Sequence, residues 1–69
     1  MKLTVGDLIY QKVNKFLYVV TNIYDGEVRI EYYDKDKKEE CYFTIKKKTI
    51  EQSFKERASD LEHFKVKRK

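Results

Sequence analysis

Residues 8–33 have the sequence LIYQKVNKFLYVVTNIYDGEVRIEYY, in which three runs of strand-forming residues alternate with turn signals. The runs cover residues 8–13, 16–23 and 28–33. Gly6-Asp7 precedes the first run, and Asn14-Lys15 and Asp25-Gly26 separate the others, as is typical of tight turns. Asparagine tolerates positive φ, so we expect a two-residue hairpin at positions 14–15. The pattern predicts an antiparallel meander.

Strict alternation assigns faces to the predicted strands, because successive side chains of a strand point to opposite sides. In the third run, Val28, Ile30 and Tyr32 share one face and the residues between them share the other. A fourth strand at 41–46 follows a charged loop at 34–40 and repeats the alternation. The residues expected to point inward on the first and fourth strands are Ile9, Gln11, Val13, Cys41, Phe43 and Ile45.

The periodicity changes after residue 48. Thr49 and Gln52 have the spacing of a capping box, and Ile50 and Phe54 repeat at the interval of a helix, which predicts a helix at 50–57. The segment 59–69 admits two interpretations. Phe64-Lys65-Val66 favours a lysine-rich fifth edge strand at 62–67. Ser59 followed by Glu62 is a second capping box, so a second or continuing helix is the alternative.

These elements predict a mainly β fold with a short helix (β+α), in a single small domain of residues 1–69 with a basic C-terminal end at 65–69. The element order, and Val5-Gly6-Asp7-Leu8-Ile9 at its start, resemble the SH3-like small barrels, which include KOW and Tudor-type modules. The KOW family has a further glycine where this chain has Val13-Asn14-Lys15, so KOW contacts with RNA or the ribosome do not carry over. The short, lysine- and tyrosine-rich chain also resembles small phage or mobile-element proteins.

Composition limits the classes of function. The 69 residues carry a net charge of +4, and no apolar run approaches the roughly 20 residues needed to cross a membrane. A single cysteine and the lack of a signal peptide predict a cytoplasmic location. Cys41 and His63 alone do not make a metal site, and we expect His63 to be an exposed edge residue. No catalytic constellation or cofactor motif is present, which predicts a protein that is not an enzyme.

Function is therefore expected on the face opposite the core, where tyrosines and cations gather. In the leading hypothesis, a small phage-encoded module binds DNA or RNA by stacking and phosphate contacts. The candidate residues are Tyr10, Lys12, Tyr18, Arg29, Tyr33, Tyr42, Lys46, Lys65, Lys67, Arg68 and Lys69. The alternative is a module that binds and regulates a host protein through the same tyrosines. Homodimerisation would also stabilise so small a domain.

Overall fold

The structure, a computed structural model, describes residues 3–56 and 60–65. Its elements are β1 (Leu8–Gln11), β2 (Phe16–Tyr24), β3 (Glu27–Asp34), β4 (Glu39–Lys46), α1 (Lys47–Glu56) and β5 (Leu61–Phe64). The strands form one antiparallel sheet in the order β4-β3-β2-β1-β5. The mainly β fold class with one helix is confirmed, and residues 61–64 are strand rather than helix. The predicted fifth strand reached residue 67, and its last two positions lie outside the described residues.

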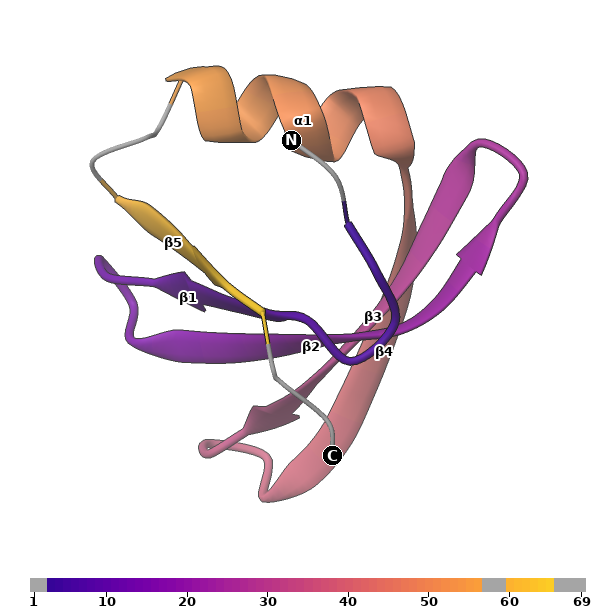
Figure 1. Cartoon of the computed structure of the whole chain (residues 1–69). Helices are drawn as coiled ribbons and strands as arrows, with labels where there is room; N and C mark the ends of the chain where they lie inside the picture. Colours follow the sequence, from indigo (N-terminus) through magenta and orange to yellow (C-terminus); the bar gives the residue numbers. More distant parts are fainter. Residues whose placement is uncertain (1–2, 57–59, 66–69) are drawn as a thin grey trace.

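The sheet is not a closed barrel. β4 and β5 are its two edges, and they do not pair with each other within the described part of the chain. Figure 1 shows the sheet curving from one edge to the other, with α1 lying across its hollow side. The predicted SH3-like barrel is therefore wrong in its closure, because the helix rather than a further strand pairing covers the hollow side. What the structure supports is a small, open, five-stranded antiparallel sheet with one helix.

The core lies between the hollow side of the sheet, called here the inner face, and α1. Val20 and Val28 are fully buried at its centre. The other buried apolar residues are Leu3, Ile9, Ile30 and Ile50. A β-bulge at Thr21 shifts the register of β2 against β3, so that Val20 pairs with Ile30 and Ile23 pairs with Val28. Without the extra residue, strand alternation would place Val20 and Ile23 on opposite faces, and the bulge also bends the strand.

Two glycines form the turns that the sequence indicated. Gly6 has φ 97° within a turn in which Asp7 N–H donates to the Thr4 carbonyl at 3.1 Å. Gly26 has φ 79° in the hairpin that joins β2 to β3. Its carbonyl also accepts a hydrogen bond from Lys47 N–H at 3.0 Å, which ties this hairpin to the start of α1.

The first connection is longer than predicted. β1 ends at Gln11 rather than at residue 13, and residues 12–15 form the turn, with Lys15 at φ 60° instead of the asparagine. Asp60 binds the backbone just beyond this end of β1: its carbonyl and its carboxylate accept Lys12 N–H (2.8 Å) and Val13 N–H (2.9 Å). Val13 was expected to point inward and is instead 76% exposed in the turn.

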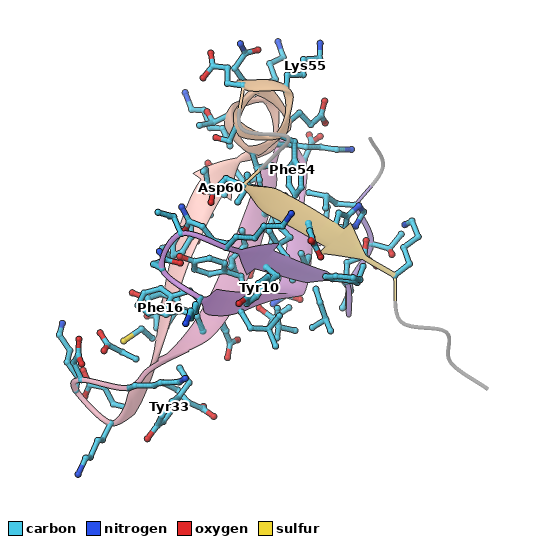
Figure 2. All side chains as sticks on the ribbon, turned by 90° about the vertical axis from the view of Figure 1, so that its left-hand side faces the viewer. Tyr10, Phe16, Tyr33, Phe54, Lys55 and Asp60 are labelled. Carbon is cyan, nitrogen blue, oxygen red and sulfur yellow. The ribbon has the colours of Figure 1, made fainter. Side chains whose placement is uncertain are left out.

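The helix begins three residues earlier than predicted, directly after β4. Thr49 therefore lies inside α1 and is not its N-cap; the Gly26 carbonyl already binds the first N–H of the helix. Ile50 is buried against the sheet. In Figure 2, Phe54 points from the helix toward the sheet and Lys55 points away from it.

β4 likewise begins two residues earlier than predicted, at Glu39, which shortens the charged loop to residues 35–38.

Candidate interaction site

The side of the sheet turned away from α1, called here the outer face, is apolar over much of its area. Strand alternation opposite the buried Ile9, Val20 and Ile30 assigns its residues. Its uncharged members on the strands include Leu8, Tyr10, Leu17, Val19, Tyr33, Tyr42, Thr44 and Phe64. Among them, Leu17 is 48% exposed and Phe64 is 45% exposed. No described element covers this face.

Three of the predicted tyrosines lie on the outer face, as alternation indicated. Tyr10 sits between Leu17 of β2 and Glu62 of β5. Tyr33 and Tyr42 lie on β3 and β4 and are 53% and 64% exposed. Figure 2 shows Tyr33 at the end of the sheet furthest from α1. Half-exposed tyrosines on a rigid sheet are typical anchors of binding surfaces.

Tyr18 does not belong to this face. Its ring packs against Tyr32 (5.4 Å between centroids) and Phe43 (6.1 Å) on the inner side. Its hydroxyl donates to Gln11 Oε1 at 3.1 Å, and burial raises the pKa of the phenol. The outward placement considered from the sequence is wrong, because Tyr18 shares its side of β2 with the buried Val20.

The outer face contains a hollow of about 480 Å³ between the first turn and the β3–β4 loop. The apolar residues that line it are Leu17, Val19 and Tyr33 of the outer face, together with Phe16 and Tyr32, which alternation assigns to the inner face. The remaining lining residues are Lys15, Lys35, Thr21, Glu31 and Glu40. The charges of two lysines and two glutamates therefore cancel around the apolar residues that line the hollow. The sequence showed no sign of this hollow, because its lining combines residues of β2, β3 and β4 with one lysine from each of two turns, and these segments meet only in the folded sheet.

Most of the predicted cations that are described already have partners within the chain. The Arg29 guanidinium lies 4.1 Å from the centre of the Tyr42 ring, and its Nε is 3.7 Å from Glu31. Lys12 Nζ lies 3.0 Å from Glu62. Lys65 Nζ lies 3.4 Å from Asp7 Oδ2. Lys46 is exposed at the end of β4, whereas Lys67, Arg68 and Lys69 lie outside the described residues.

Carboxylates alternate with the tyrosines across the outer face. Four glutamates from the strands lie on it, at positions 27, 31, 40 and 62. Three cations face the same way, at positions 12, 29 and 46. The net charge of +4 that the whole chain carries is therefore not concentrated on this face.

A buried ionic cluster, which sequence reasoning missed, lies at the start of β1. The Asp7 carboxylate is almost fully buried and accepts hydrogen bonds from Thr4 N–H (2.9 Å) and the Thr4 hydroxyl (2.8 Å). His63 Nε2 lies 2.8 Å from Asp7 Oδ2, and its ring also meets the Phe54 ring. Burial raises the pKa of Asp7, but the hydrogen bonds from Thr4, His63 and Lys65 outweigh it, so the pKa lies well below its ordinary value.

This cluster corrects the prediction for His63, whose side chain is only 16% exposed rather than a solvated edge residue. The sequence alone gave no reason to pair it with a particular carboxylate, although Asp60 and Glu62 are its neighbours in the chain. The actual partner is 56 positions away. It became a neighbour because β5 pairs with β1, bringing His63 opposite Ile9. A glycine–aspartate turn with a histidine on the partner strand is the signal that would have found it.

Among residues 3–56 and 60–65, no group of three or more histidine, cysteine, aspartate or glutamate side chains is arranged to hold a metal ion. Within the same ranges, no helix has the length and apolar character that crossing a membrane requires.

Comparison of the chain with protein-family models, with curated proteins and with solved structures finds no match in any of the three.

Proposed function

We propose that this chain is a small, non-enzymatic protein-interaction module whose outer face docks onto a partner protein. The observation that carries the proposal is the uncovered apolar and aromatic surface around the hollow, where Leu17 and Tyr33 are each about half exposed. Exposed apolar patches rimmed by polar residues mark interaction sites on small soluble domains. The matching partner surface has apolar or aromatic side chains that fill the hollow and a rim of balanced charge.

The charge of the outer face favours a protein over a nucleic acid as partner. Nucleic-acid affinity comes largely from contacts between lysine or arginine and phosphates. Here the glutamates at the hollow, Glu31 and Glu40, would face those phosphates, and Arg29 and Lys12 already interact with acidic residues. Stacking on Tyr33 and Tyr42 would bring a polyanion against these carboxylates. Binding of DNA or RNA, the leading hypothesis from the sequence, therefore becomes the competing outcome of the test.

The same proposal includes the cellular location and the biological role of the module. Cys41 is the only cysteine of the chain and is free, which suits a reducing cytoplasm. Regulation of a host protein by a phage or mobile-element product remains the biological role that we associate with it. This association rests on the small size and composition of the chain alone.

Leu17→Lys tests the outer face, because it places a charge on the apolar floor of the hollow. Immobilised wild-type protein should retain one partner in stoichiometric amount from a nuclease-treated lysate, and L17K should retain at least about tenfold less. The matched control is Val13→Lys, which adds the same charge at an exposed apolar residue of the first turn, outside the hollow. V13K should retain the partner as the wild type does.

The same three proteins are titrated with single-stranded and duplex oligonucleotides at low and high salt. We expect no saturable binding. Binding that is lost when salt is raised, in L17K and wild type alike, would support a nucleic-acid module and overturn the proposal. Equal loss of the protein partner in L17K and V13K would show that the outer face is not the interface.

A further inference from the structure

β4 is an unusually unprotected sheet edge. It pairs with β3 over eight consecutive positions without a register shift, and nothing in the described structure pairs with its other side. Residues 41–45 carry no charge, and the chain has no proline to interrupt the strand. Natural proteins block such edges with charges, prolines, bulges or short strands. An edge of this length and regularity is suited to the addition of another strand.

The other edge shows the usual protection. β5 has four residues, and two of them are charged or titratable side chains held in ion pairs. Glu62 pairs with Lys12 at 3.0 Å and His63 with Asp7 at 2.8 Å. The contrast between the two edges makes β4 the place where a strand can be added.

The register of β4 shows which of its backbone groups are available. Lys47 N–H donates to the Gly26 carbonyl, one step beyond the Glu27↔Lys46 pair. Hydrogen-bonded and non-hydrogen-bonded pairs alternate along an antiparallel ladder. The odd-numbered residues of β4 therefore direct their N–H and C=O groups toward β3. The even-numbered residues, from Glu40 to Lys46, direct theirs away from the sheet.

We propose that β4 binds the β4 strand of a second copy of this chain, antiparallel and across a two-fold axis at Phe43, to form a continuous ten-stranded sheet. In this register Glu40 lies opposite the partner's Lys46, and Lys46 lies opposite the partner's Glu40. Tyr42 lies opposite the partner's Thr44, so all four outward-directed residues are paired. The interface is isologous, as in most dimers.

Charge complementarity selects both the partner and the register. Glu40 and Lys46 bound the uncharged segment, so a two-fold axis between them forms two opposite-charge cross-strand pairs. Moving the axis by one residue to Tyr42 places Lys46 opposite the partner's Lys38 and leaves Glu40 opposite the partner's Thr44. Phe43, which is 38% exposed because the sheet does not close, gains a partner ring only when the axis is at Phe43.

Sedimentation of the full chain between about 1 µM and about 1 mM tests the dimer, and a charge swap tests its register. E40K and K46E should each raise the dimer dissociation constant at least about tenfold, because each replaces two attractions by two repulsions. The double variant E40K/K46E should restore the wild-type constant to within about threefold. Both side chains are exposed, so the free energy of unfolding measured in dilute samples should be the same in the variants and the wild type.

Cysteine cross-linking gives a second, independent readout. On a C41S background, F43C should form a disulfide-linked dimer under mild oxidation, because residue 43 lies opposite itself across the axis. Y42C on the same background is the control, because position 42 lies opposite the partner's Thr44, and it should form little cross-link. The proposal would be overturned if the chain remained monomeric at the highest concentration. It would also be overturned if neither E40K nor K46E changed the dimer dissociation constant. Equal cross-linking of F43C and Y42C would overturn it as well.

Discussion

At the scale of single residues, Asp7 combines the turn role that the sequence indicated with a second role that the sequence did not reveal. Its carboxylate closes the Gly6 turn onto Thr4, and it also holds His63 and Lys65 of the distant C-terminal segment. A buried carboxylate requires such partners, because burying an unpaired charge costs several kcal/mol. The aspartate of the turn signal therefore fastens the last strand to the first.

Asp7→Asn should lower the free energy of unfolding by about 2–4 kcal/mol, because it removes the charge that satisfies these donors. Asp36→Asn, in the exposed β3–β4 loop, is the control and should stay within about 0.5 kcal/mol of wild type. Urea unfolding at neutral pH measures both changes. A D7N effect as small as that of D36N would contradict the role assigned to the cluster.

The depressed pKa of Asp7 also predicts how stability depends on pH. A carboxyl group with a lower pKa in the folded state stabilises the fold fully above its unfolded pKa of about 3.9 and loses that contribution as pH falls further. Wild-type stability should thus decline below about pH 4 more steeply than that of D7N. Parallel curves of unfolding free energy against pH for the two proteins would exclude this contribution.

At the scale of elements, the sequence located the strands well and their ends poorly. Alternation of side chains identified β2, β3 and β4 to within two residues, because period-two burial is a local property. The ends of β1 and α1 depend on Asp60 and on Gly26, which are distant in sequence from the residues whose backbone they bind. Such tertiary hydrogen bonds have no local signature.

Turn conformation provides an element-scale prediction. Gly26→Ala should lower the free energy of unfolding by about 1 kcal/mol, because φ 79° is strained for alanine although nothing lies within 4 Å of the added methyl group. Lys38→Gly, at a lysine with φ 55°, should leave stability within about 0.5 kcal/mol of wild type or raise it. Equal destabilisation by both changes would show that strain in the turns does not govern either position.

At the scale of the whole molecule, curvature without closure determines which surfaces are available. α1 covers the inner face, while none of the described elements covers the outer face or pairs with the free edge of β4 (Figure 1). The sequence placed Tyr10, Tyr33 and Tyr42 on the outer face correctly because their positions follow from alternation. Alternation also put Glu31 on the face of Tyr33, but it did not reveal Glu40 opposite Tyr33 or Glu62 opposite Tyr10, because cross-strand partners depend on the register.

Site-specific photo-crosslinking at position 33 tests most directly whether the outer face binds a protein. A photoreactive phenylalanine analogue replaces Tyr33 at the hollow or, as a control, the exposed Lys55, which points away from the sheet on α1. Irradiation in cells should yield one protein adduct at position 33 and none at position 55. Adducts that disappear on nuclease treatment, or the same adduct at both positions, would contradict the account.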